Sequence, residues 1–412
     1  MTRAPATPRK ILDWLVSAPV FGFAILGPYL PLLILFAGTL PPSAPHPPLA
    51  LAAAIGIATA VLLLAGFAGL CLRGVHVFPK NLWLPLAGLL AAQLLAVAWA
   101  VFPAASLFSI VTLLAGFVVL ICATEILGDD RTRRWFLACY LISAAVAALG
   151  ACILSVSKLP PAMFAYEHGR ASGSFLQPNE LAGYLLFVIP LGLAQLAAPQ
   201  PWRSIGILAA GFGVLGLVLS VSRAAIVSLL VALVIFVRKL GRNQTIAYLA
   251  VAAIGLLLLA TVFRDVAHDP SENASRLAVW AGAARMAQRF ALTGVGPFGF
   301  HLVYPAFRLP KYTASEVHAH SLPLQLLIEN GILGLAAVCW FVVAVWRATA
   351  RTGQAIVPED RERVLLFAAL LTGFGATALQ NTVDVVTTFL LVVAWPMLGL
   401  LLALGRPREA GA

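Results

Sequence analysis

The stretch of sequence that decides the fold is residues 205–237, IGILAAGFGVLGLVLSVSRAAIVSLLVALVIFV. It is almost entirely apolar over 33 residues, whereas a helix needs only about 20 to cross a bilayer. A polar cluster at 220–223, Ser-Val-Ser-Arg, interrupts it. Because an unpaired charge is costly inside lipid, we expect two membrane-spanning helices at 204–221 and 224–237, joined by a tight turn at this cluster.

The composition of the whole chain leads to the same fold class. Of its 412 residues, 61% are hydrophobic and 10% are charged, compared with about 25% charged in an ordinary soluble domain. Lipid offers no hydrogen-bond partner to the backbone, and the apolar runs are too long and too continuous for the strands of a membrane barrel. We therefore predict an all-α polytopic membrane protein and exclude a soluble one.

The apolar runs predict about twelve transmembrane helices in a single domain that covers residues 1–412. We place them at 12–38, 48–71, 81–102, 105–127, 134–156, 180–199, 204–221, 224–237, 245–263, 321–346, 364–383 and 387–404. The first run follows a charged start but has no clear cleavage site, so we expect it to remain as the first span.

The basic residues give the orientation in the membrane. With the N-terminus inside, 18 Lys and Arg fall in cytoplasmic segments and 9 in external ones, which is the bias expected of a spanning protein. Without the turn at 220–223 every later loop changes side, the counts become 15 and 11, and Arg223 is left in lipid. The net charge of +11 therefore reflects orientation and does not indicate nucleic-acid binding.

Two predicted external segments, 158–179 and 264–320, are longer than the other connections, and loops of this length are usually functional. The second contains Asp-Pro-Ser-Glu at 269–272, a typical helix start, and a Gly/Pro cluster at 293–297, where a helix must end. We expect an amphipathic helix from about 270 to 290, lying against the external face of the membrane. Its apolar stripe should comprise Leu277, Trp280, Ala284 and Ala287.

Arginine predominates among the predicted external cations, with seven arginines and two lysines. A guanidinium can hold phosphate oxygens through two parallel hydrogen bonds, so the bias fits a polyphosphate ligand. Contact with phospholipid headgroups is the better explanation for most of these residues. Helical geometry places Arg285 and Arg289 on the polar face and Arg276 nearly opposite, toward the protein body. Arg223, in a tight turn between spans, is costly unless paired or functional.

The pair His318 and His320 lies just ahead of the tenth predicted span. An interfacial histidine with a pKa near neutrality suits general base catalysis on a hydroxyl group. The alternative, a polar residue at a helix start, is more credible for His318 than for His320. A metal site is disfavoured because only Glu316 is near, and we expect neither metal nor cofactor. The sequence has no phosphate-binding glycine loop, which excludes an ATP-driven pump.

Polar side chains within the spans are also candidates, because they are rare there without a function or a partner. Glu329 lies about two turns into the tenth span and either contributes to a binding site or pairs with an arginine. Gln380, Asn381 and Asp384 lie near the outer end of the eleventh span.

Three blocks of sequence, taken in order, resemble the O-antigen ligase family of polytopic glycosyltransferases. This family includes Wzy-type polysaccharide polymerases and protein O-oligosaccharyltransferases. The first block is 169–179, GRASGSFLQPN. The second comprises 275–280, SRLAVW, and 292–297, LTGVGP. The third comprises 318–322, HAHSL, and 329–334, ENGILG.

The resemblance extends over about residues 160–345 and implies a GT-C-like fold with an external, periplasmic loop at 264–320. The implied reaction moves a glycan from undecaprenyl pyrophosphate to a hydroxyl acceptor, with inversion and without metal. It implies a multi-pass protein of the bacterial inner membrane whose active site faces the periplasm. Ser321 stands where the family commonly has asparagine, which leaves the class of acceptor open.

Motif position assigns the pyrophosphate to Arg223 and Arg276, and activation of the acceptor hydroxyl to His320. The further candidate substrate-binding residues are Arg170, His318, Asn179 and Glu329.

The resemblance leaves several functions open. A ligase that uses lipid A–core as acceptor leads, a polymerase that uses a growing O-antigen or exopolysaccharide follows, and a transporter is the rival from another class. A transporter would be expected to hold its polar residues near the bilayer midplane on broken helices. The implied partners are membrane lipids, the lipid-linked glycan, its acceptor and a flippase acting upstream, with no nucleic acid.

Overall fold

The computed structural model describes residues 7–30, 49–157, 170–242 except 176, scattered positions between 245 and 257, 271–312 and 316–406. Within these residues the chain is helical, with no β-sheet. The long helices are α1 (Thr7–Leu26), α3 (Leu49–Arg73), α4 (Trp83–Ala98), α5 (Pro103–Ile126), α6 (Asp130–Ser157), α7 (Pro178–Ala194), α8 (Trp202–Ser220), α9 (Arg223–Val237), α11 (Ser271–Phe290), α13 (Leu322–Ala355), α14 (Arg361–Gln380) and α15 (Thr387–Ala403).

The described residues include nine helices that are long and apolar enough to cross a membrane, and shorter apolar helices at Arg223–Val237 and Val393–Ala403. The all-α membrane class is therefore confirmed. Most of the predicted span 245–263, and part of the predicted external loop 264–320, lie outside the described residues, so the number twelve stays a prediction.

The division of the long apolar stretch is confirmed. Helix α8 ends at Ser220 and α9 begins at Arg223. Between them, Val221 adopts a left-handed conformation with φ of 50°, which is unusual for a β-branched residue, and Ser222 is extended. The polar cluster thus turns the chain between two apolar helices.

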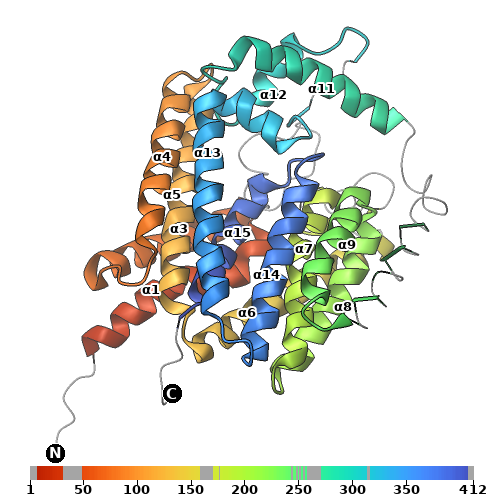
Figure 1. Cartoon of the computed structure of the whole chain (residues 1–412). Helices are drawn as coiled ribbons and strands as arrows, with labels where there is room; N and C mark the ends of the chain where they lie inside the picture. The colour runs from red at the N-terminus through yellow and green to blue at the C-terminus, as the bar shows by residue number, and fades with distance from the viewer. Residues whose placement is uncertain are drawn as a thin grey trace, which may run out of the picture.

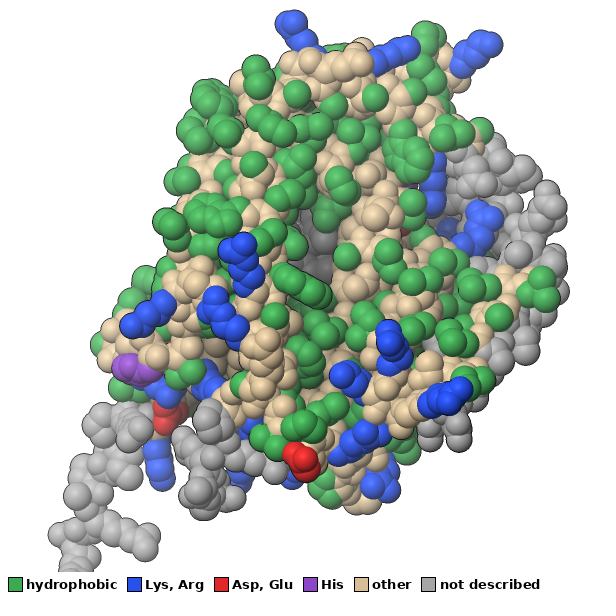
Figure 2. Space-filling view, viewed as in Figure 1, with side chains coloured by type: hydrophobic (Ala, Val, Ile, Leu, Met, Phe, Trp, Pro, Cys, Tyr) green, Lys and Arg blue, Asp and Glu red, His purple; other side chains and the backbone are tan. Residues whose placement is uncertain are grey.

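Helix α7 is the centre of the bundle. It packs against α8 and α14. In its 18-residue apolar stretch, 83% of the residues are buried inside the protein, compared with 11% in the corresponding stretch of α3. A helix that is apolar all round and buried by neighbours belongs in a core, whereas one that exposes apolar side chains in a membrane protein faces lipid. Figure 2 shows the result on one face: hydrophobic side chains cover the sides, and basic side chains gather in the lower part and at the upper edge.

The two ends of the bundle differ. The start of α1 and the connection between α13 and α14 lie at the lower end in Figure 1, whereas α11 and the short α12 (Phe300–Val303) lie across the upper end. Near the start of α14, Arg134 donates two hydrogen bonds to Glu362, at 3.1 and 2.8 Å, and Arg363 contacts Asp130 at 2.7 Å. These ion pairs join α6 to α14.

The helix predicted at 321–346 is longer and broken. Helix α13 extends to Ala355, and Gly331 inside it has φ of 66° and ψ of −175°, a conformation essentially confined to glycine. The apolar pattern is continuous through this point, so periodicity alone could not reveal the break.

Candidate functional site

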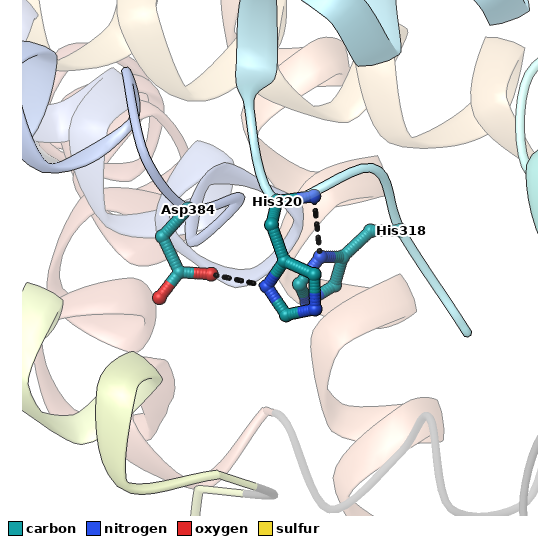
Figure 3. Close-up of side chains that lie close together, drawn as sticks. All are labelled: His318, His320 and Asp384. Carbon is teal, nitrogen blue, oxygen red and sulfur yellow. Dashed lines mark hydrogen bonds and ion pairs between the residues drawn. The ribbon is translucent and has the colours of Figure 1, made fainter. Parts of the chain in front are cut away.

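The site is built around a short turn immediately before α13. In this turn His318 and His320 come together with Asp384, which lies in the connection between α14 and α15 (Figure 3). Nδ1 of His320 is 3.6 Å from Oδ1 of Asp384, and Nε2 of His320 is 3.3 Å from Oε2 of Glu316. The two ring nitrogens of one histidine therefore face two carboxylates.

This arrangement fixes the charge of His320. A negative carboxylate at ion-pair distance from each ring nitrogen favours the positively charged, doubly protonated imidazolium. Burial alone would lower the pKa of His320, but its contacts with Asp384 and Glu316 outweigh burial and raise it to about 9. For the two acids, burial raises the pKa, but the contacts with His320 outweigh it and lower both values.

His318 is held differently. Its Nδ1 accepts a hydrogen bond from the backbone N–H of His320 at 3.2 Å, and the two rings lie edge to face with centroids 4.3 Å apart. Burial first, and then the charge of His320, lowers the pKa of His318 to about 4. His318 is thus neutral, with one nitrogen occupied by the backbone.

The backbone of the turn is pinned from two helices. His320 has φ of 48°, and its carbonyl accepts a hydrogen bond from the Trp280 indole of α11 at 3.3 Å. The N–H of Ala319 donates to the side chain of Gln325 in α13 at 2.7 Å. A non-glycine residue at positive φ is held only where its surroundings determine it, and such residues concentrate at functional sites.

Arg276 belongs to this same cluster. It is half-buried and lies about one helical turn before Trp280, whose indole contacts the carbonyl of His320. Its positive charge lowers the pKa of both His318 and Asp384. Arg285 and Arg289, on the same helix, are exposed, as helical geometry predicted.

The apolar stripe predicted for this helix was wrong in register. The helix itself, at Ser271–Phe290, agrees with the prediction, but Leu277 is 64% exposed. Instead Val279, Ala283 and Met286 are fully buried, against the stacked rings of Phe300 and Tyr304 among others. Two stripes one or two residues apart are nearly equal in hydrophobicity in a helix with six alanines, and the partner surface selects between them.

Arg170 and Asn179 form a second cluster. The buried guanidinium of Arg170 donates to the carbonyl of Ser220 at 2.9 Å and to the side chain of Asn179 at 3.1 Å. It thereby joins the start of α7 to the turn that precedes Arg223, which is half-buried at the start of α9.

The end of α14 links the two clusters. The side chain of Gln380 donates a hydrogen bond to the backbone carbonyl of Asn179 at 3.1 Å. The backbone carbonyl of the following residue, Asn381, accepts the N–H of Leu322 at 2.8 Å, and Leu322 is two residues after His320. Asp384 follows in the same connection. The candidates from both clusters are thus held around the end of one helix.

Glu329 has a different environment. Its carboxylate accepts the N–H of Phe300 at 3.2 Å, and its carbonyl accepts the N–H of Gly296 at 3.0 Å. The second bond satisfies a carbonyl freed by the break at Gly331, and Ile332 donates across the same gap to Ala291 at 2.7 Å. The segments 292–297 and 329–334 therefore interlock, and Glu329 lies in that junction.

The arrangement bears directly on metal binding. His318, His320 and Asp384 offer donor atoms within 4.8 Å of one another, a grouping that the sequence argument, which considered only Glu316, did not foresee. Three of the ring nitrogens, however, already face partners: two carboxylates for His320 and a backbone N–H for His318. This pattern fits an ion-paired imidazolium and not a set of metal ligands.

Sequence reasoning missed two partners of His320. Glu316 precedes it by four residues and was noted only as a possible ligand, whereas Asp384 is 64 residues away and was noted only as a buried acid. The general rule that a buried acid has a basic partner predicts such a partner for Asp384. The rule does not say which basic residue this is, so it could not have named His320.

Comparison with known protein families gives one match. Residues 208–339, about a third of the chain, match the family model described as O-antigen ligase. The matched range contains the second and third sequence blocks and α9, α11 and the first half of α13. A comparison with curated proteins finds no match. The match agrees with the resemblance of the second and third sequence blocks, and the first block, 169–179, lies outside the matched range.

Proposed function

We propose that this chain, as an O-antigen ligase-type protein, is a glycosyltransferase that moves a glycan from undecaprenyl pyrophosphate to a hydroxyl acceptor. The observation that carries the proposal is the His320–Asp384 pair beside Arg276, at the end of the bundle away from the start of α1. A histidine oriented by a buried carboxylate is a recurrent arrangement for activating a hydroxyl nucleophile.

In the proposed reaction the acceptor oxygen attacks the anomeric carbon of the lipid-linked sugar. A new C–O bond forms as the bond between that carbon and the pyrophosphate breaks, and the pyrophosphate leaves with the electron pair. The acceptor proton passes to Nε2 of His320. Attack opposite the leaving group inverts the anomeric carbon, and neither metal nor cofactor is required.

Arg276 and Arg223 stabilise the negative charge that grows on the pyrophosphate. A guanidinium offers a planar pair of donors that matches two phosphate oxygens. Arg276 is near enough to His318 and Asp384 to bring the leaving group and the base to one place. Arg170 and Asn179 support the turn before Arg223, and His318 supports the backbone of His320.

Asp384 is the positioning residue for His320 in this proposal. It faces Nδ1 at 3.6 Å and is nearly buried, with 2% of its side chain exposed. Its Oδ1 also accepts the N–H of Val385 at 2.9 Å, which fixes the carboxylate. It leaves Nε2 as the nitrogen that meets the acceptor.

The orientation in the membrane completes the proposal. The charge distribution places both termini in the cytoplasm, so the opposite end, with α11 and the histidine turn, faces the periplasm of a bacterial inner membrane. The donor must therefore be moved to the outer leaflet by a flippase before transfer. Lipid A–core is the acceptor we favour, and a growing polysaccharide is the alternative.

The test is transfer by the purified protein in nanodiscs supplied with a lipid-linked glycan. Lipid A–core and a second, undecaprenyl-linked glycan are offered in parallel, with the His320→Ala variant as control. We expect a product on one acceptor and none from the variant. No product on either acceptor from well-folded protein contradicts the proposal, and a product only on the second acceptor identifies a polymerase.

A further inference from the structure

Glu316 occupies the nitrogen of His320 that the proposed reaction needs. Its Oε2 lies 3.3 Å from Nε2 of His320, and its Oε1 accepts a hydrogen bond from the Tyr312 hydroxyl. An acceptor hydroxyl that is to lose its proton to Nε2 must come within hydrogen-bond distance of the same atom. In the structure, therefore, a carboxylate fills the position that the hydroxyl would take.

The same contact keeps His320 in its protonated form. With Asp384 at 3.6 Å from Nδ1 and Glu316 at 3.3 Å from Nε2, the doubly protonated imidazolium is favoured, and in that form neither nitrogen can accept a proton. The arrangement in the structure thus has the base in its inactive form.

We propose that Glu316 holds the place of the acceptor hydroxyl at Nε2 of His320, and that transfer requires the acceptor to displace it. This inference rests on the proposed function and adds a residue that controls when the base is available. Once Glu316 is displaced, the imidazolium is no longer stabilised at Nε2 and releases that proton to solvent. Nε2 then faces only the acceptor hydroxyl, whose proton it can accept, while Asp384 stays at Nδ1.

The two carboxylates differ in how firmly they are held, which is why Glu316 and not Asp384 is the one that moves. The side chain of Glu316 is 20% exposed, compared with 2% for Asp384. Asp384 is also bonded to the backbone N–H of Val385, in a connection where Asn381 accepts the N–H of Val386 at 3.0 Å. Within the described residues, Glu316 is also bonded to the hydroxyl of Tyr312, a side chain that can rotate away.

The charged groups around His320 set the sign of the expected pH effect. Glu316 and Asp384 contact it directly, His318 lies against it, and Arg276 is near His318 and Asp384; Tyr312 acts through Glu316. Burial lowers the pKa of His320, and the contacts with Asp384 and Glu316 outweigh it and raise this pKa. The proposed reaction requires neutral His320, so the transfer rate should rise as the pH rises through the pKa of His320. Removing the charge of Glu316 should lower this pKa and move the rise in rate to lower pH.

The test compares wild type with Glu316→Gln in transfer assays from pH 6 to pH 10. We expect the acidic limb of the pH profile of kcat/KM for the acceptor to shift to lower pH by about one pH unit or more. The rate at pH 7 should then rise on the order of tenfold. The acceptor KM should fall, because no charged group has to be displaced. Glu359→Gln, an exposed acid near the other end of the bundle, is the matched control and should leave the limb unchanged.

A second measurement does not depend on transfer. The titration of His320, followed by NMR of histidine-labelled protein without substrate and assigned with a His320→Gln variant, should move to lower pH in Glu316→Gln. If the titration of His320 is the same in Glu316→Gln as in wild type, the inference is overturned. It is also overturned if Glu316→Gln loses kcat while the acidic limb of its pH profile stays in place, because Glu316 would then itself be the base. Wild-type protein that transfers to no acceptor instead contradicts the proposed function, whatever the titration shows.

Discussion

At the scale of single residues, the side chains around His320 carry distinct tasks. Asp384 orients one ring nitrogen, Glu316 covers the other, and Arg276 supplies positive charge beside them. The sequence selected His320 and Arg276 as candidates from their position and from helix geometry, and their roles stay predictions. It could not identify Asp384 as their neighbour, because the contact joins two connections that are 64 residues apart.

The arginines should differ sharply in their effect on transfer. Arg276→Ala and Arg223→Ala should lower the rate about 30- to 1000-fold, since a guanidinium contact that strengthens in the transition state contributes about 2–4 kcal/mol. Lysine should restore little, because it keeps the charge and loses the paired donors. Arg285→Ala and Arg289→Ala, on the exposed face of α11, are the matched controls and should be mild. Equal defects in all four variants would indicate a diffuse basic surface.

Chelation should leave transfer unchanged. Both ring nitrogens of His320 face carboxylates and Nδ1 of His318 faces a backbone N–H, so the cluster is built for ion pairing. We expect equal rates with and without EDTA, measured after dialysis against it. A loss that a divalent cation restores would show that His318, His320 and Asp384 act as ligands instead.

At the scale of elements, the break in α13 explains why two sequence blocks occur together. Gly331 turns the chain out of the helix, and the freed carbonyls of Ile328 and Glu329 are satisfied by the N–H groups of Val295 and Gly296. The end of α11 is thereby fixed to the start of α13, and so Arg276 is fixed relative to His320. The segments 292–297 and 329–334 thus provide each other's hydrogen-bond partners.

Substituting the glycines of this junction should therefore disturb both stability and transfer. A Cβ on Gly331 would lie 2.6 Å from the carbonyl oxygen of Leu292, and one on Gly294 would lie 2.3 Å from that of Glu329, both at positive φ. We expect Gly331→Ala to cost about 1–3 kcal/mol for the backbone conformation alone. A lowered Tm and reduced transfer check this, against Gly211→Ala in α8, where a Cβ meets nothing within 4 Å. A Gly331→Ala protein as stable and active as wild type would contradict the interlock.

Elements were more predictable from the sequence than the contacts between them. Continuous apolar runs specify helices because lipid excludes any other backbone arrangement, and the cluster at 220–223 specified the turn because its arginine could not stay in lipid. The register of the stripe on α11 depended on the aromatic rings it covers, and the break at Gly331 depended on a loop about 35 residues earlier in the chain. Neither partner is visible in a local window of sequence.

At the scale of the whole molecule, the account requires that the two ends of the bundle lie on opposite sides of the membrane. The start of α1 is at one end and α11 is at the other (Figure 1). In a cysteine-free background, Arg289→Cys on α11 should react with an impermeant maleimide in spheroplasts, and Arg361→Cys at the start of α14 only after permeabilisation. Both positions are exposed. Protection of position 289 until permeabilisation would place the site in the cytoplasm and contradict the periplasmic assignment.

The central claim is that this protein makes a glycosidic bond at the expense of a lipid pyrophosphate. The most direct measurement follows donor, product and released undecaprenyl pyrophosphate together, in nanodiscs that contain only the purified protein, and determines the anomeric configuration of the product. We predict one pyrophosphate released for each glycan transferred, an inverted linkage, and neither product from His320→Ala. A donor that stays intact in the presence of every acceptor, or pyrophosphate release that His320→Ala leaves unchanged, would contradict the account.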